Sequence, residues 1–148
     1  MTDKIKMRII FSLVLYNQKE SELIPLFESI SKFSLYLKQK SKGYRLELFI
    51  TDNGYRSNYN ISKTLENIEE YKCEYFRSEK NIGFGQGHNL NLIEKANLKS
   101  NDLVVIINPD ISFSPEELLP AFEYLINEKN IVCIAPLIKN DCNRIQYT

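Results

Sequence analysis

The residues best suited to chemistry form a glycine-rich segment and a short polar motif that follows it. Segment 81–89 reads Asn-Ile-Gly-Phe-Gly-Gln-Gly-His-Asn, and Asn108-Pro109-Asp110 comes after one expected helix and strand. Glycine lets a backbone approach a ligand closely and turn its N–H groups toward it. A carboxylate at a strand end, such as that of Asp110, can hold a hard cation. Together the two motifs predict a site for a diphosphate and its metal ion.

Two further polar pairs follow expected strands. Tyr16 and Asn17 end the first apolar run, and Asp52 and Asn53 end the second. Plainer interpretations stay open for each motif: Asp52-Asn53-Gly54 and Asn108-Pro109-Asp110 are also typical turns, and the glycine segment could be a flexible loop. His88 is the only histidine, and lone histidines are more often structural than ligand-binding.

Apolar runs alternate with segments of helical period. The pattern predicts strands at 8–16, 46–51, 73–77, 103–108 and 131–135, and helices at 20–42, 61–71, 89–98 and 114 to about 129. Pro25 is expected in the first turn of its helix, where a missing N–H costs nothing. Ser114-Pro115-Glu116-Glu117 combines a capping serine, a proline at the first helical position and a capping-box glutamate, and so marks a helix start.

This alternation predicts an α/β fold, a mostly parallel sheet with helices on both faces. Its 148 residues, with no repeat or linker, fit a single domain over 1–148. Because the carboxyl ends of parallel strands meet at one edge, all four polar clusters are expected to share that edge.

Composition excludes several classes of function. Nineteen basic and nineteen acidic side chains give zero net charge, with no basic stripe for nucleic acid. Cys73, Cys133 and Cys142 show no Cys-x-x-Cys spacing, so a reducing cytosol is expected, with Cys73 and Cys133 buried in strands. The longest apolar run, 9–16, is too short to cross a membrane, although peripheral attachment stays open.

Comparison with common phosphate-binding motifs is informative. A dinucleotide fold has its glycines in the first strand-to-helix turn and its ribose-binding acid later, whereas here Asp52 precedes the glycines. No Gly-Lys-Ser/Thr follows the glycines, so a P-loop is excluded. Phosphoacceptor domains need paired acids after the first strand, where this chain has Tyr16-Asn17, and nucleotidyltransferases usually want a basic glycine-rich loop near that strand.

Taken together, Tyr16-Asn17, Asp52-Asn53-Gly54, the segment 81–89 and Asn108-Pro109-Asp110 resemble the nucleotide-sugar half of family 2 glycosyltransferases. Within that family they are most similar to the rhamnosyltransferase-like branch. The similarity covers nearly the whole chain in order and spacing. It implies a Rossmann-like GT-A fold that binds a nucleotide-diphosphate sugar.

The resemblance also implies roles for individual residues. Asp52 would hydrogen-bond the base, the first strand's turn would line the base pocket, and the glycine segment would pass beside ribose, phosphates or sugar. Asn108 and Asp110 would take the place of the family's Asp-x-Asp and hold Mg²⁺ or Mn²⁺, with modest affinity because one carboxylate is replaced. The implied donor-site residues are Tyr16, Asn17, Asp52, Asn53, Asn81, Gly83, Phe84, Gly85, Gly87, Asn89 and Asn108.

The general base of the family comes from a later segment, so no catalytic base is identified in this chain. Segment 140–146 resembles the Asp-Gly-x-x-Gln turn that precedes the acceptor region, with Cys142 in place of glycine. We therefore expect the acceptor-binding part to be absent from these 148 residues.

The sequence thus predicts a metal-assisted, inverting glycosyltransferase that acts on a saccharide or lipid-linked acceptor in bacterial polysaccharide synthesis. It would be cytoplasmic, with the inner membrane face as one location. The alternative is a degenerate domain that binds a nucleotide or a partner protein without catalysis.

Overall fold

The computed structural model describes residues 7–40, 43–54, 61, 65, 68–140 and 142–145. The chain divides into two compact units, Met1–Ser114 and Pro115–Thr148. No helix in the described part of the chain is long and apolar enough to span a membrane.

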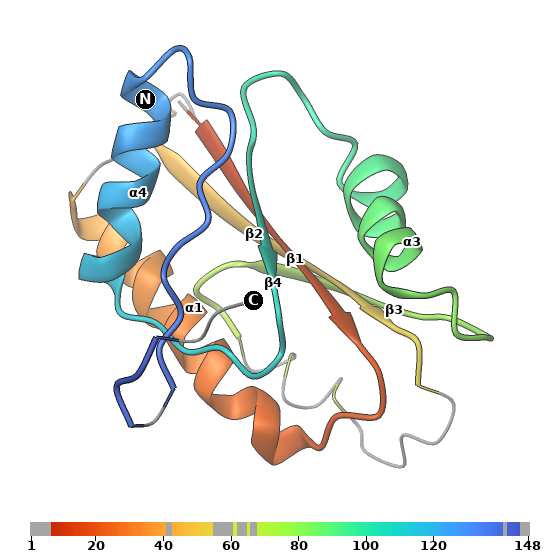
Figure 1. Ribbon diagram of the computed structural model, residues 1–148. Helices are drawn as coiled ribbons and strands as arrows, with labels where there is room; N and C mark the ends of the chain where they lie inside the picture. Colours follow the sequence, from red (N-terminus) through yellow and green to blue (C-terminus); the bar gives the residue numbers. More distant parts are fainter. Residues whose placement is uncertain are drawn as a thin grey trace. The chain divides into compact units, whose positions relative to one another are not determined.

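A parallel sheet of four strands forms the first unit (Figure 1). Its spatial order is β3-β2-β1-β4, built from β1 (Met7–Leu15), β2 (Tyr44–Asp52), β3 (Lys72–Arg77) and β4 (Leu103–Ile107). The chain winds outward from β1 to β3 and then returns to place β4 on the other side of β1. In such sheets the point where the winding reverses, here between β1 and β4, is where ligands bind, outside the carboxyl ends of the strands.

One face of the sheet packs against the long helix α1 (Glu20–Lys40). Phe11 of β1 meets Phe33 of α1 edge to face, with ring centroids 6.3 Å apart, and Phe113 stacks on Phe11 at 6.0 Å. Leu48 and Ile50 of β2 point to the same face and are fully buried. These aromatic and aliphatic side chains form the main core of the unit.

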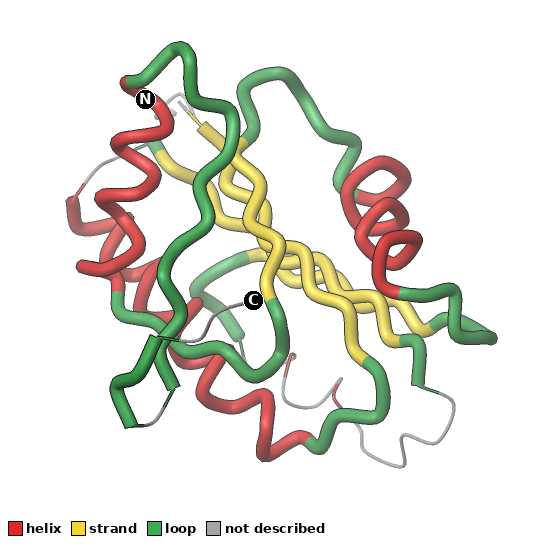
Figure 2. Tube along the Cα trace, viewed as in Figure 1, coloured by secondary structure: helices red, strands yellow, loops and turns green. Residues whose placement is uncertain are grey.

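The opposite face packs against α3 (Phe84–Asn89) and η1 (Leu90–Lys95), a single continuous rod that widens into a π-helical turn (Figure 2). Ile10 and Phe49 pack there against Leu92 and Ala96. The widening shows in the hydrogen bond from the N–H of Ala96 to the carbonyl of Asn91, five residues back, at 2.8 Å. Helices therefore cover both faces of the sheet, as predicted.

Arg8 fastens the end of this rod to the sheet. Its guanidinium donates to the carbonyl oxygens of Ala96 and Asn97 at 3.0 and 3.2 Å, and pairs with Asp102. Asn97 has φ 50°, the left-handed conformation in which helices commonly end. Although burial opposes ionisation, the hydrogen bonds from Arg8 and from the Lys99 N–H hold the pKa of Asp102 below its usual value.

The second unit contains α4 (Pro115–Asn127) and an antiparallel bridge between Lys139 and Ile145. Pro115 stands at the first helical position, as predicted. The strand predicted at 131–135 is wrong: residues 131–138 have no regular structure, and Val132 is 92% exposed. Cys133 is therefore neither in a strand nor buried, whereas Cys73 lies half-buried in β3, and burial raises the pKa of its thiol to about 12.

Other boundaries differ by a few residues from the predicted ones. Pro25 was wrongly expected in the first turn of α1: the helix begins at Glu20, so the proline lies beyond that turn. Ser29 lies four residues later and donates its hydroxyl to the Pro25 carbonyl at 2.8 Å. Of the helix predicted at 61–71, residues 62–64, 66 and 67 lie outside the described residues, Ile61 and Leu65 are helical, and residues 68–71 are not.

Phe33→Ala should lower the free energy of unfolding by about 3–5 kcal/mol, because it removes a fully buried ring and leaves a cavity against Phe11 and Phe113. Urea denaturation followed by circular dichroism measures the change. Ile93→Ala, at a site 65% exposed, is the matched control and should stay within about 0.5 kcal/mol of the parent. Equal losses in both variants would contradict the assigned core.

Candidate functional site

The carboxyl ends of β1 and β2 bring two predicted turns into contact. Asn17 follows β1 in the left-handed conformation, with φ 60°. A Cβ placed on Gly54, which follows β2, would lie 2.9 Å from Asn17 Oδ1 and 3.0 Å from Asp52 Oδ1. Only glycine fits there without a shift of its neighbours. Tyr16, next to Asn17, is 46% exposed at this edge.

Asp52 is fully buried at the end of β2. Its Oδ1 accepts the N–H of Gly54 at 2.8 Å, and its Oδ2 accepts the hydroxyl of Tyr75 at 2.7 Å. The carboxylate therefore shapes the turn, as the plainer interpretation of Asp52-Asn53-Gly54 predicted. Its contact with a base stays a prediction, and would use acceptor positions beside these two bonds.

Asn53 connects the end of β2 to the glycine segment. Its side-chain amide donates to the carbonyl of Gly83 at 3.2 Å and accepts the N–H of Ile82 at 3.4 Å. Asn81 closes a local turn by accepting the N–H of Gly83 at 2.8 Å. Two asparagines that were predicted to bind ligand thus hold the entry into the helix in place.

The helix begins inside the glycine segment, not after it as predicted. Gly83 precedes α3 with φ 85°, and no side chain caps the helix. The first intrahelical bond runs from the N–H of Gly87 to the carbonyl of Gly83, 3.1 Å away. The N–H groups of Phe84, Gly85 and Gln86 have no place in the helical ladder, and all three residues are exposed.

The two helical glycines differ in their surroundings. A Cβ on Gly87 would lie 2.7 Å from Cγ2 of Val14 in β1, so this glycine permits close packing of helix on strand. A Cβ on Gly85 would meet nothing within 4 Å. The close approach predicted for both glycines is therefore an internal packing contact at Gly87, whereas Gly85 faces open space.

A chain of buried hydrogen bonds joins the rod to the sheet. Thr51 of β2 donates to Oδ1 of Asn91 at 2.7 Å, and Nδ2 of Asn91 donates to the hydroxyl of Ser12 and the carbonyl of Leu13, both at 3.0 Å. The Ser12 hydroxyl lies 2.7 Å from Nδ1 of His88. The sequence did not identify Ser12, Thr51 and Asn91 as a hydrogen-bonded group. The one indication was that each is a polar residue within an apolar segment.

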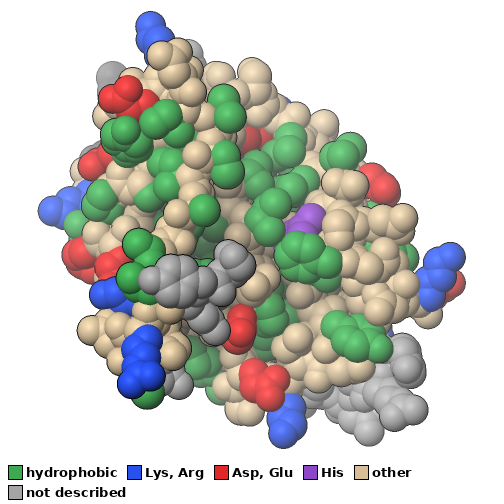
Figure 3. Space-filling model, in the orientation of Figure 1, with side chains coloured by type: hydrophobic (Ala, Val, Ile, Leu, Met, Phe, Trp, Pro, Cys, Tyr) green, Lys and Arg blue, Asp and Glu red, His purple; other side chains and the backbone are tan. Residues whose placement is uncertain are grey.

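His88 is hydrogen-bonded to Ser12. The Ser12 hydroxyl accepts from Nδ2 of Asn91 and shares a hydrogen bond with Nδ1 of His88, in which either atom can be the donor. Burial lowers the pKa of His88, which favours the neutral ring. Nε2 is buried without a partner among the described residues, and Phe84 packs across the ring with centroids 4.3 Å apart. Figure 3 shows the histidine between hydrophobic side chains on this face.

Asn108 and Asp110 follow β4, whose carboxyl end lies beside that of β1. Both side chains are exposed. Three residues on, the N–H of Phe113 donates to the Ser29 hydroxyl at 3.2 Å and so ties this segment to α1. One carboxylate and one amide oxygen suit a hard cation that takes its remaining ligands from a bound anion. Among the described residues no group of three or more His, Cys, Asp or Glu side chains could hold a metal ion.

The predicted residues lie at one edge of the sheet, and they form a buried group and a solvent-facing group. Asp52, Asn53 and Gly87 are buried and bonded within the protein. Those whose side chains or backbone face solvent are Tyr16, Asn17, Asn81, Gly83, Phe84, Gly85, Asn89, Asn108 and Asp110.

His88 should titrate with a midpoint below the ordinary imidazole value of about 6.5. Because the unfolded chain then binds the proton more readily, the free energy of unfolding should fall as pH decreases below about 6.5 and level off below the folded pKa. NMR of the single imidazole gives the midpoint, and urea denaturation at several pH values gives the stability. His88→Gln should remove this pH-dependent component. A midpoint above 6.5 would contradict the buried neutral ring.

Gly87→Ala should destabilise the fold by about 1–3 kcal/mol through its clash with Val14. Gly85→Ala places the same methyl group in open space on a helix, and should leave stability unchanged or raise it by up to about 1 kcal/mol. Thermal denaturation of the pair tests the distinction. If both variants lose stability equally, the local packing is assigned incorrectly.

Comparison with known proteins adds the family. The model described as "Glycosyl transferase family 2" matches residues 12–148. The chain therefore belongs to glycosyl transferase family 2, and its α/β fold with a parallel sheet agrees with the GT-A core of that family. No curated protein matches the chain significantly.

Proposed function

We propose that this member of glycosyl transferase family 2 transfers a sugar from a nucleotide-diphosphate donor to a saccharide or lipid-linked acceptor, with inversion. The observation that carries the proposal is the arrangement at the carboxyl edge of the sheet. There an uncapped helix start follows β3 and Asp110 follows β4, on opposite sides of β1, with β2 between β1 and β3. A donor diphosphate needs both positive N–H groups and a cation.

The base pocket is proposed at the turns after β1 and β2. Tyr16 offers an exposed ring for stacking, and Asn17 offers an amide beside Gly54. Asp52 would accept a hydrogen bond from the base, while its bonds to Tyr75 and Gly54 keep the carboxylate oriented. A ring and a fixed acceptor together can select a nucleobase.

The diphosphate is proposed to lie at the start of α3. The N–H groups of Phe84, Gly85 and Gln86 would donate to its oxygens as negative charge grows on the leaving group. Asn108 and Asp110 would hold Mg²⁺ or Mn²⁺, which supplies neutralising charge to the departing diphosphate when bound. Asn81 and Asn89, exposed at either end of this region, are proposed to contact ribose or sugar.

Rhamnose is the donor sugar we propose, with bacterial polysaccharide as the product and the cytoplasmic face of the membrane as the location. These finer assignments rest on the resemblance of the glycine segment and the Asn-Pro-Asp motif to the rhamnosyltransferase-like branch.

A second candidate is a domain that binds the nucleotide without catalysis. It is favoured by the scarcity of carboxylates among the described site residues, since Asp52 is buried and bonded and Asp110 is assigned to the metal. An inverting transfer needs a general base for the acceptor hydroxyl. Radiolabelled sugar transfer to a panel of acceptors separates the two candidates, because only the enzyme forms product.

Metal ion and nucleotide diphosphate should each raise the affinity of the other by the same factor, since one carboxylate holds the cation weakly until diphosphate oxygens complete its shell. Isothermal titration with UDP, GDP and dTDP, with and without Mn²⁺, measures this coupling. Asp110→Asn should abolish it while retaining most metal-independent binding.

Two variants serve as controls for this experiment. Glu116→Gln removes an exposed carboxylate of α4 and should leave the coupling unchanged. Gly85→Ala should weaken nucleotide binding without loss of stability, because its methyl group would occupy the space proposed for the phosphates. Coupling that survives Asp110→Asn would remove the metal assignment.

A further inference from the structure

A second concentration of charge lies at the opposite end of the sheet, where the strands begin. A cavity of about 530 Å³ opens there, between the start of the sheet and the end of η1. Five cationic side chains and two carboxylates line it, a surplus of three positive charges. Its lining reaches along β2 from Arg45 to Phe49, and none of the lining residues belongs to the proposed donor site.

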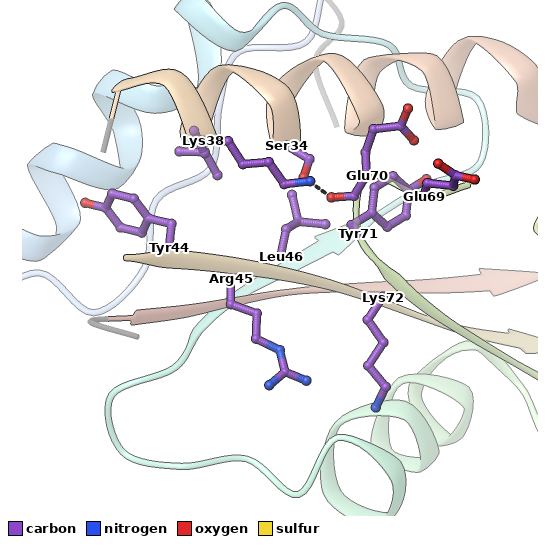
Figure 4. Close-up of a pocket in the computed structure, with 10 residues that line it drawn as sticks. Ser34, Lys38, Tyr44, Arg45, Leu46, Glu69, Glu70, Tyr71 and Lys72 are labelled. Atoms are coloured by element: carbon purple, nitrogen blue, oxygen red, sulfur yellow. Dashed lines mark hydrogen bonds between the residues drawn. The ribbon is translucent and has the colours of Figure 1, made fainter. Parts of the chain in front are cut away.

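Three of these cations come from neighbouring strands and share one face of the sheet. Arg8 and Arg45 are register partners on β1 and β2, and Lys72 begins β3 opposite Glu47. Figure 4 shows the side chains of Arg45 and Lys72 leaving the sheet on the side opposite α1. Like charges on adjacent strands repel each other, so this row lowers stability unless an anion lies close by.

The two carboxylates neutralise the inner part of the row. Glu47 is buried and lies 2.7 Å from Arg45 Nε and 3.4 Å from Arg8. Asp102 pairs with Arg8, whose guanidinium is fully engaged with Asp102, Glu47 and the carbonyls at the end of η1. Arg8 is thus a structural residue. Glu47 and Asp102 pair with Arg8 and Arg45, and Lys72 pairs with Glu74 on its own strand.

The outer cations remain available. Lys95 lies 4.5 Å above the ring of Phe76, and neither it nor Lys99 makes a salt bridge with any described residue. The Arg45 side chain is 47% exposed, so its outer nitrogens face the cavity beyond Glu47. These three cations reach the cavity from β2, from η1 and from the loop that follows it.

We propose that this cavity binds a phosphate-bearing ligand, held by Arg45, Lys95 and Lys99 above a floor formed by Arg8 and Glu47. Phosphate suits the site because its several oxygens can accept from a guanidinium and two ammonium groups at once. The ligand is either a soluble phosphate or the headgroup of an anionic lipid.

Inorganic phosphate is the first probe, titrated at constant ionic strength and followed by amide NMR of the whole chain. Saturable shifts are expected at Lys72, Ala96 and Ser100. Sedimentation with vesicles of phosphatidate, compared with phosphatidylcholine, is the second arm. Saturation by free phosphate identifies a soluble ligand, and binding only to phosphatidate vesicles identifies a lipid headgroup.

The double variant Lys95→Gln/Lys99→Gln should weaken whichever interaction is seen by at least about fivefold, as expected for two cations near an anion. Lys32→Gln/Lys129→Gln removes the same charge elsewhere and should bind like the parent. Nucleotide diphosphate affinity should be equal in both variants. No saturable binding in either arm, shifts confined to Phe84 and Gly85, or equal weakening in the two double variants would overturn the proposal.

Discussion

The hydrogen-bond chain from Thr51 through Asn91 and Ser12 to His88 determines where the glycine helix lies on the sheet. Buried polar groups are costly unless they are paired, and here each depends on the next for its partner. A shift of the helix by one residue would leave several of them unpaired at once. The chain of bonds therefore sets the position of the helix start relative to the strand ends, and with it the geometry of the whole candidate site.

The glycine segment serves the fold and the site through different residues. Gly87 lets the helix approach Val14 closely enough for His88 and Asn91 to reach Ser12. Gly83 supplies the positive φ with which the chain enters the helix, a conformation that favours glycine. Gly85 makes no such packing contact, because a Cβ placed on it would meet no atom within 4 Å. One motif thus combines residues fixed by packing with a residue whose open surroundings suit a ligand.

The sequence was a good guide where a pattern was long or its chemistry was local. The parallel strands appear as short apolar runs, and Ser114-Pro115 marked the start of α4 within one residue. The start of α3 was missed because glycines disfavour helices, and only the contacts of Asn53 and the packing on Val14 hold that turn in place. The apolar run at 131–135 looked like a strand, but local composition does not specify a pairing partner.

The sequence predicted the location of the site on the sheet better than it predicted the contacts of each side chain. Parallel strand ends had to meet, so the grouping of Tyr16, Asp52 and Asp110 at one edge followed from topology alone. Which side chains face inward did not follow, because the hydroxyl that bonds to the buried Asp52 carboxylate comes from Tyr75 of a different strand. The hydrogen bonds of Asn53 likewise join segments distant in sequence.

β4 forms one border of the sheet, and no strand of the described chain pairs with its outer side. Its five residues are all aliphatic, and Val104 and Ile106, which lie on the same face as Ile10 and Ser12 of β1, are 38% and 58% exposed. Unpaired backbone groups beside an uncharged aliphatic surface are a template for another strand. A further strand can therefore pair with the outer side of β4 without any rearrangement of the strands that carry the site.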